Sequence, residues 1–220
     1  MNKNCVVKTL VANLYSEPTF KSELVTQALI NENLKILEIQ DNWYKVKQWD
    51  NYISWIHKFY TSTKAEDLPN SWSNLDSKIK DVNFLISYAN SFLGTPYLWG
   101  GKSALGFDCS GFVQTVFKMC GISLPRDASQ QIKDKNLIEI NYKSIEKGDL
   151  LFFSDDNLIN HVGIYYGGGN IIHSSGNVKI ENLEDNKDLY NKARRRKYID
   201  RPRQNNINIK ASRWFCSNTI

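Results

Sequence analysis

The chain has 220 residues, of which 41% are hydrophobic and 12% aromatic, and this composition excludes a wholly disordered protein. It contains no run of about 18 apolar residues, which excludes a transmembrane helix. Lys8 interrupts the one apolar stretch near the start, so the usual hydrophobic segment of a secretory signal is missing. We therefore expect two domains, at least one of them small, in a protein that stays in the cytoplasm.

The formal net charge of +5 is unevenly distributed. Nine Lys or Arg and one acid, Asp200, lie between Lys192 and Arg213, so this segment carries +8 and the rest of the chain −3. The basic run 194–197 is typical of a solvated helix end or loop, and an anionic partner is the alternative. Because neither aromatic interleaving nor a nucleic-acid motif accompanies the run, we expect no nucleic acid as a partner.

The four cysteines are scattered along the chain, as Cys5, Cys109, Cys120 and Cys216. Small domains held by disulfides carry a higher density of cysteines, and zinc knuckles need closely spaced pairs. Neither pattern is present, so we expect free thiols in a reducing compartment.

Residues 5–60 alternate apolar and polar side chains in short segments separated by turn residues. This alternation predicts half-buried antiparallel strands, and five or six strands in so short a segment favour a small all-β barrel. The pattern Asn42-Trp43-Tyr44 followed by Tyr52-x-x-Trp55-Ile56 resembles the bacterial SH3-like domains that accompany cell-wall enzymes. We assign residues 1–62 to this domain and the polar, proline-containing residues 63–74 to a linker.

The rest of the chain predicts helices first and antiparallel strands after them, which is an α+β arrangement. Apolar residues at three- and four-residue spacings predict one helix over about 75–93 and another over 109–120. The segments on either side of the glycines 167–169 are expected to pair as a hairpin. We assign residues 75–203 to this domain and 204–220 to a C-terminal tail.

Cys109 lies where a polar loop turns into the second amphipathic helix, in the sequence Asp108-Cys109-Ser110-Gly111. Unpaired backbone N–H groups and the positive end of the helix dipole favour a thiolate at such a position, and a thiolate is a nucleophile. A small residue packed beneath the helix is the competing interpretation of this cysteine.

Two of the three histidines flank the glycine hairpin, since His161 begins one strand and His173 ends the next, whereas His57 is expected to be structural. Pairing of the two strands would bring both rings to the same end of the sheet. His161 would then take the proton of Cys109, and His173 would hydrogen-bond the other ring nitrogen of His161 and fix its orientation. The candidate catalytic residues are therefore Cys109, His161 and His173.

Five sequence blocks, in this order, together resemble the NlpC-type (NlpC/P60) cell-wall cysteine peptidases over about residues 75–200. The blocks are 108–112, 124–131, 148–153, 161–165 and 172–176. The resemblance implies a papain-like fold and a triad in which Cys109 is the nucleophile, His161 the base and His173 the orienting member. The tract 96–101 also matches the family, which implies that Tyr97 lies beside the reacting carbonyl.

An SH3-like domain before such a peptidase domain is similar to one subgroup, the γ-D-glutamyl-L-diamino acid endopeptidases. They cut murein peptides between D-Glu and the diamino acid and prefer a free N-terminal L-Ala. The resemblance implies that Asp108 and a tyrosine, best matched by Tyr52, hold the substrate ammonium, and that Ser110 and Asp127 help to bind the peptide. The competing interpretations are a helix N-cap for Asp127, a core or surface aromatic for Tyr52 and an ordinary first-turn residue for Ser110. Ile53-Ser54 departs from the Pro-Gly that the subgroup often has there.

The sequence thus predicts acyl transfer to water on a murein peptide, in cell-wall recycling, without a metal or an organic cofactor. Three alternatives stay open: an N-acetylmuramoyl-L-alanine amidase or acyltransferase of the same fold, an inactive wall-binding module, and a zinc site built from Cys109, His161 and His173. The sequence leaves the diamino acid open between diaminopimelate and lysine. We expect a monomer with no membrane span.

Overall fold

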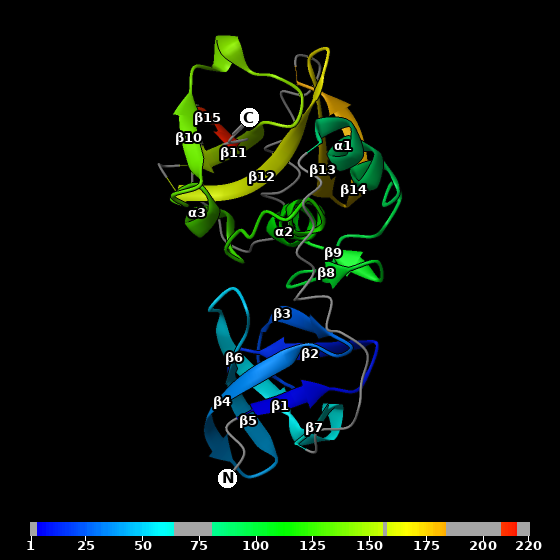
Figure 1. The fold of residues 1–220 in the computed structure, drawn as a ribbon, viewed down its shortest axis with the longest axis vertical. Coiled ribbons are helices and arrows are strands. Elements are labelled where there is room, and N and C mark those ends of the chain that lie inside the picture. The colour runs from blue at the N-terminus through cyan, green and yellow to red at the C-terminus, as the bar shows by residue number, and fades with distance from the viewer. Residues whose placement is uncertain (1–3, 64–80, 156–157, 184–207, 215–220) are drawn as a thin grey trace, which may run out of the picture.

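The computed structural model of the chain describes residues 4–63, 81–155, 158–183 and 208–214 (Figure 1). These residues form a strand-rich N-terminal domain and a larger domain in which helices pack on a sheet. Most of the expected linker 63–74 and the basic run 194–197 lie outside the described residues. Within the described ranges, no helix has the length and apolar character needed to cross a membrane.

Seven antiparallel strands build the N-terminal domain: β1 (Asn4–Val7), β2 (Val11–Tyr15), β3 (Leu24–Leu29), β4 (Asn33–Gln40), β5 (Trp43–Lys47), β6 (Ile53–His57) and, after the short 3₁₀ helix η1 (Lys58–Tyr60), β7 (Thr61–Ser62). Their order in the sheet is β3-β2-β6-β5-β4-β1-β7. Asp41 and Asn51 turn the β4–β5 and β5–β6 hairpins with φ angles of 47° and 67°, a conformation that Asn and Asp adopt more readily than most residues. The predicted all-β architecture is confirmed.

β3 was not among the predicted strands, because its apolar and polar residues do not alternate. Thr26 and Gln27 are both buried, although they are polar neighbours in the chain. Both side chains accept hydrogen bonds from the second domain, Thr26 from Nε of Arg126 at 3.1 Å and Gln27 from the backbone N–H of Lys102 at 3.0 Å. Because β3 faces the second domain as well as its own sheet, its sequence lacks the alternation of apolar and polar residues that predicts a strand.

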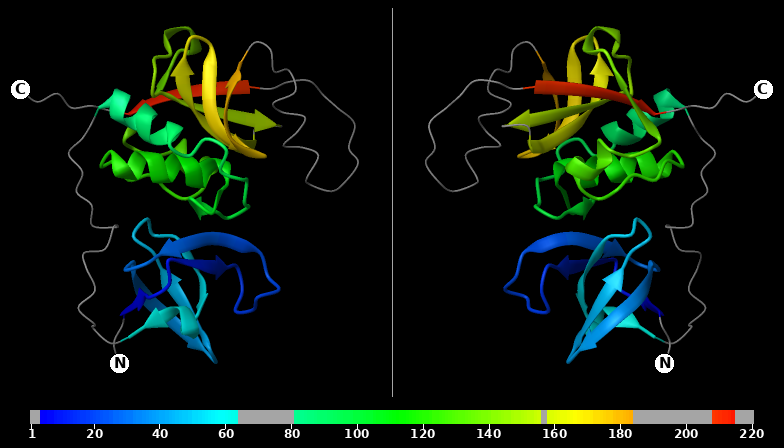
Figure 2. Two further views of the ribbon diagram at one scale, coloured as in Figure 1. Left: turned by 90° about the vertical axis from the view of Figure 1, so that its right-hand side faces the viewer. Right: turned by 90° about the vertical axis from the view of Figure 1, so that its left-hand side faces the viewer.

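The larger domain runs through α1 (Val82–Asn90), β8 (Lys102–Ser103), β9 (Gly106–Phe107), α2 (Cys109–Met119), α3 (Ala128–Gln131), β10 (Leu137–Ile140), η3 (Tyr142–Ser144), β11 (Leu150–Asp155), β12 (Leu158–Gly167), β13 (Asn170–Ser175), β14 (Asn177–Asn182) and β15 (Asn208–Trp214). The last six strands form an antiparallel sheet in the order β10-β15-β11-β12-β13-β14. α2 lies between this sheet and the N-terminal domain (Figures 1 and 2). The predicted α+β class is confirmed.

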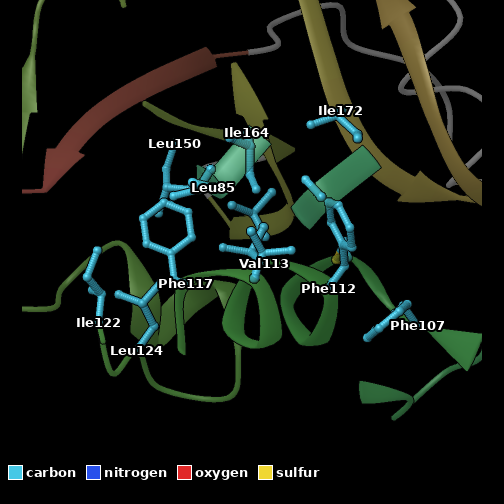
Figure 3. Packing of buried hydrophobic residues seen from close by; sticks show 14 of the residues in the cluster. Leu85, Phe107, Phe112, Val113, Phe117, Ile122, Leu124, Leu150, Ile164 and Ile172 are labelled. Atoms are coloured by element: carbon cyan, nitrogen blue, oxygen red, sulfur yellow. The ribbon is translucent and has the colours of Figure 1, made fainter. Parts of the chain in front are cut away.

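α2 is the central helix of the larger domain, because its apolar residues contact both α1 and the sheet. Phe112, Val113 and Phe117 belong to one buried cluster with Leu85 of α1 and Ile164 of β12 (Figure 3). Full burial of a side chain of this size contributes about 1.5–3 kcal/mol. This packing along the helix fixes its first turn, which carries Cys109.

Residues 204–220 were expected to form a tail, but 208–214 form β15 in the interior of the sheet, between β10 and β11. Arg213 anchors this strand, since its Nε and Nη2 atoms each donate to one carboxylate oxygen of Asp149 at 2.9 Å. The partner strands of β15 lie far earlier in the chain, so no local pattern indicated the pairing. The domain therefore extends to Trp214 and does not end at residue 203.

The first helix that the structure describes in this domain, α1, begins at Val82. Asp81 is its N-cap, and the Asp81 side chain accepts the backbone N–H of Asn83 at 2.9 Å. The helix was expected from about residue 75, and residues 75–80 lie outside the described residues. α1 therefore starts at Val82, because Asp81 supplies the acceptor that a helix start needs.

Candidate active site

Cys109 is the first residue of α2, and Asp108 caps that helix. Oδ1 of Asp108 accepts the backbone N–H of Gly111 at 2.7 Å, which satisfies one of the N–H groups left unpaired at a helix start. Glycine is needed at position 111, because a Cβ atom there would lie 2.1 Å from the carbonyl oxygen of Gly101. This close approach between a loop and the first turn fixes the position of Cys109.

The Cys109 thiol is buried, with only 9% of the residue exposed. Burial and then the Asp108 carboxylate raise its pKa to about 12, although backbone hydrogen bonds from Val162 and Ser110 to the sulfur oppose the shift. Burial thus opposes the thiolate that the helix N-terminus favours. A base must remove the thiol proton during the reaction.

His161 of β12 and His173 of β13 hydrogen-bond each other, with Nε2 of His161 lying 2.7 Å from Nδ1 of His173. The turn between the strands has three glycines with φ angles of 102°, 60° and 77°, a region that favours glycine. This is the hairpin that the sequence indicated. A contact so short leaves no space for a metal ion between these two nitrogens, which argues against a zinc site built from this pair.

The thiol lies against the strand that carries His161. Val162, whose backbone hydrogen-bonds the sulfur of Cys109, directly follows His161 in β12. Nε2 of His161 is used by His173, and Nδ1 makes no hydrogen bond within the part of the chain that the structure describes. Nδ1 is therefore the ring nitrogen available for the thiol proton.

Both histidines are uncharged at neutral pH. Burial, and then the neighbouring His173, lower the pKa of His161 well below its ordinary value of 6.5. Burial also lowers the pKa of His173, against the opposing effect of the Glu181 carboxylate. Burial thus disfavours charge on the thiol and on the imidazole alike.

Asp108 also forms a buried ion pair with Arg126, whose side chain is 1% exposed. Nη1 and Nη2 of Arg126 donate to the two carboxylate oxygens of Asp108, Nη1 at 3.0 Å. The amide of Gly100 and the hydroxyl of Ser110 donate to the same carboxylate at 2.9 and 3.3 Å. Together with the amide of Gly111, these five hydrogen bonds fill the roughly four lone-pair sites of a carboxylate. The role expected for Asp108, holding a substrate ammonium, does not fit this arrangement.

Ser110 is committed to the same network. Its Oγ atom accepts a hydrogen bond from Nη1 of Arg126 at 3.0 Å and donates to Asp108. The serine is therefore more than an ordinary first-turn residue, and its hydroxyl orders the ion pair beside the candidate nucleophile.

Tyr52 and Asp127 meet across the domain boundary, and both are half-buried. Burial raises the pKa of Asp127, whereas the Arg126 charge and a hydrogen bond from the Tyr52 side chain oppose the shift. Burial and the Asp127 carboxylate raise the pKa of Tyr52 to about 12, so its hydroxyl stays protonated. Asp127 is the N-cap residue of α3, as the competing interpretation expected, but its side chain makes no capping hydrogen bond. The two side chains present a carboxylate and a hydroxyl at the boundary.

The backbone of Tyr97 lies near the start of α2, which carries the candidate nucleophile. Its N–H donates to the carbonyl of Gly176, in the β13–β14 turn, at 2.9 Å, and its backbone forms a bridge with Phe107, two residues before Cys109. The Tyr97 side chain is half-buried. This place between the cysteine and the strand of His173 is compatible with the position expected beside a reacting carbonyl.

Polar contacts between the two domains hold Tyr52 at this place. The hydroxyl of Thr26, in β3, accepts a hydrogen bond from Nε of Arg126 at 3.1 Å. Asp50 accepts the backbone N–H of Tyr52 at 3.0 Å with Oδ1 and the side-chain amide of Gln114, in α2, at 2.8 Å with Oδ2. The N-terminal domain therefore contributes directly to the surroundings of the site.

Sequence reasoning missed two charged residues that the structure places here. Arg126 directly precedes Asp127 in one of the five sequence blocks, and only this position in the sequence indicated that Arg126 lies near the site. Glu181 lies in β14, and its Oε2 atom is 2.9 Å from Nε2 of His173. No motif indicated Glu181, because the pairing of β13 with β14 decides its contact.

Two family models match the chain. The model of the NlpC/P60 family matches residues 94–198, and that of the bacterial dipeptidyl-peptidase SH3 domain matches residues 14–58. Residues 94–198 belong to the NlpC/P60 family. The resemblance seen in its sequence blocks, and in its N-terminal strands, is thereby confirmed.

Named proteins are similar to this NlpC/P60 chain over part of their length. A gamma-D-glutamyl-L-lysine dipeptidyl-peptidase of Bacillus cereus is 35% identical over 170 residues, which covers 74% of this chain and 47% of the relative. The protein of the same name from Bacillus subtilis is 47% identical over 105 residues, covering 46% of this chain and 35% of the relative. The chain thus spans less than half the length of these relatives.

Solved structures of the NlpC/P60 family also match the chain. The crystal structure of a family protein from Bacillus cereus has 30% sequence identity and a TM-score of 0.49. It covers 87% of this chain, and the match takes in 61% of the solved chain.

Proposed function

We propose that this NlpC/P60 chain is a cysteine endopeptidase that hydrolyses the bond between D-Glu and the L-diamino acid of murein peptides with a free N-terminal L-Ala. The observation that carries the proposal is Cys109 at the start of α2 beside the hydrogen-bonded pair of His161 and His173. The names of the two Bacillus relatives support the choice of bond.

In the proposed reaction, Nδ1 of His161 takes the proton from Sγ of Cys109 as the sulfur attacks the γ-carbonyl carbon of D-Glu. The attack turns an uncharged pair into an imidazolium and an oxyanion. The backbone N–H of Cys109 and the hydroxyl of Tyr97 are the proposed oxyanion donors. Loss of one such donor typically lowers the rate by about 10²–10³-fold.

The imidazolium of His161 then gives its proton to the amine of the diamino acid, the C–N bond breaks, and a thioester with Cys109 is left. His161, again neutral, takes a proton from water as the water oxygen attacks the thioester. Transfer of that proton to the sulfur releases L-Ala-D-Glu and restores the thiol. Atoms and charges balance with the residues of this chain and water.

Selectivity for a free amine is proposed to come from Asp127 and Tyr52. An ammonium group that leaves water needs a carboxylate and further acceptors, or its desolvation is not offset. Asp108 is committed to Arg126, whereas the Asp127 carboxylate has Tyr52 as its hydrogen-bond partner. In this proposal Asp108 and Ser110 hold Arg126 in place and do not contact the ammonium.

We expect turnover of the tripeptide L-Ala-γ-D-Glu-diamino acid to fall when its amino group is acetylated, and equally when Asp127 is replaced by Asn. Each change removes one charge of the proposed pair, and a hydrogen bond to a charged group contributes about 1.5–3 kcal/mol, or roughly 10- to 100-fold in kcat/KM. Initial rates for both peptides with both proteins measure the effect. The exposed Glu139, replaced by Gln, is the matched control. Equal rates on the free and acetylated peptides would contradict the ammonium pocket.

The rate should stay high at mildly acidic pH. His161 is held neutral by burial, which lowers its pKa below 6.5, so it still acts as a base as the pH falls through 6.5. Protonation at lower pH then removes the base. A profile of kcat/KM against pH checks this expectation, and an acid limb centred above 6.5 would be inconsistent with a buried neutral base.

Mass spectrometry of the products identifies the cleaved bond and the diamino acid. Loss of the diamino acid from the free tripeptide supports the proposal. Cleavage of an N-acetylmuramoyl-L-alanine bond, or an adduct with an added amine, would instead indicate an amidase or an acyltransferase. Fragments with a free L-Ala arise only after other enzymes have trimmed the wall, so we place the reaction in cell-wall recycling.

A further inference from the structure

The hydrogen-bonded chain of the candidate site continues beyond His173. Nε2 of His173 lies 2.9 Å from Oε2 of Glu181, and Nζ of Lys179 donates to the other oxygen, Oε1, at 2.6 Å. We propose that Glu181 is a positioning residue that fixes the tautomers of both histidines, so that Nδ1 of His161 is left unprotonated towards Cys109. The consequence for turnover rests on the function proposed above.

The strand pairing places Glu181 where it can serve this purpose. In the β13–β14 pair, His173 lies opposite Lys179 and Ile171 lies opposite Glu181. Lys179 and Glu181 are two residues apart on one strand, so their side chains leave the same face of the sheet. Only 17% of the Glu181 side chain is exposed, and His173 is fully buried. The contact is therefore made away from bulk water.

Glu181 is ionised throughout the working pH range. Partial burial opposes its charge, but hydrogen bonds from His173 and Lys179 outweigh that effect and lower its pKa to about 2. An ionised carboxylate can only accept hydrogen bonds. The hydrogen between Glu181 and His173 must therefore sit on Nε2 of His173.

The remaining protons follow from this one. A neutral imidazole has one N–H, so Nδ1 of His173 is an acceptor when Nε2 carries the hydrogen. Its partner, Nε2 of His161, must then be the donor in the 2.7 Å contact. Nδ1 of His161 is left with a lone pair, which is the state that a base needs. One carboxylate thus sets the protonation of two rings.

The charge of Glu181 should also favour the imidazolium that forms on His161. The groups that face the two rings are the Phe153 ring from β11, and Lys179 and Glu181 from β14. The Cys109 thiol of α2 lies against Val162, the residue that follows His161. Glu181 raises the pKa of His161 and Lys179 lowers it. Removing the two charges one at a time should therefore move the titration of His161 in opposite directions.

Glu181→Met keeps the length of the side chain and removes both the acceptor and the charge. We expect kcat/KM to fall roughly 10- to 100-fold, as for other groups that orient a functional histidine. The acid limb of the pH profile should move to lower pH. Glu181→Asp, which keeps the carboxylate, should recover part of the rate. Lys179→Met removes the positive partner of the Lys179–Glu181 ion pair. The acid limb of the pH profile of this variant should move to higher pH.

A measurement that needs no substrate separates this inference from the proposed function. The chain has three histidines, so long-range ¹H–¹⁵N spectra of ¹⁵N-histidine protein resolve each ring tautomer. We expect Nε2–H on both His161 and His173 in the wild type and in Lys179→Met, and mixed tautomers in Glu181→Met. Unchanged tautomers and an unmoved acid limb in Glu181→Met would overturn the inference. Fixed tautomers that are lost in Glu181→Met, in a protein that cleaves no murein peptide, would support it and refute the function instead.

Discussion

Replacement of Cys109 by alanine should abolish cleavage of the murein tripeptide and leave the fold intact. The sulfur is the proposed nucleophile, and loss of one member of such a triad lowers kcat by about 10⁴-fold or more. Alanine differs from cysteine by one sulfur atom, so the smaller side chain removes little packing even at this buried position in the first turn of α2. Turnover by mass spectrometry and thermal unfolding by circular dichroism measure the two effects separately.

Cys120→Ala is the matched control, because Cys120 is a buried cysteine at the other end of the same helix. It should lose stability of the order of 1 kcal/mol and keep its activity. Continued cleavage by Cys109→Ala would remove the proposed mechanism. A wild-type protein that binds murein fragments without cutting them would instead favour the inactive wall-binding alternative.

Replacement of Arg126 by leucine should destabilise the protein by about 3–5 kcal/mol, which is the usual cost of breaking a buried ion pair from one side. The buried Asp108 carboxylate, on a side chain that is 10% exposed, would lose two of its donors and keep its charge. Thr26 of the N-terminal domain would lose its partner as well. Urea unfolding followed by tryptophan fluorescence measures the change.

The exposed pair of Lys45 and Glu38, 3.5 Å apart, provides the comparison. Lys45→Met should change stability by at most about 1 kcal/mol, because water screens exposed charges. A combined Arg126→Leu and Asp108→Asn protein should regain part of the lost stability, since the unpaired charge is then absent. A loss in Arg126→Leu no larger than that in Lys45→Met would show that the ion pair is not a buried structural element.

The histidine pair could be predicted because short-range patterns determine it. The glycine turn between His161 and His173 allows β12 and β13 to pair as a hairpin. The two histidines are only 12 residues apart in the chain. The position of Cys109 at a helix start follows equally from local residues, with Asp108 as the cap. These features depend on little beyond their own segment.

The remaining features depend on contacts between distant segments. Glu181 meets His173 only through the register of β13 and β14, and Arg126 meets Thr26 across 100 positions of the chain. The raised pKa of Cys109 reflects how completely the fold covers it, which no helix pattern reports. The hydrogen bonds between Asp108 and Arg126 likewise depend on the fold. Because of them, the proposed contact with the substrate ammonium lies at Asp127 and not at Asp108.

The place of β15 governs when the larger domain can be completed during translation. β10 and β11 are synthesised well before the strand that lies between them, and β11 in turn supports β12, which carries His161. Until residues 208–214 have left the ribosome, both neighbours present open strand edges to other nascent chains. The unfinished sheet is therefore the stage at which chaperone protection matters most.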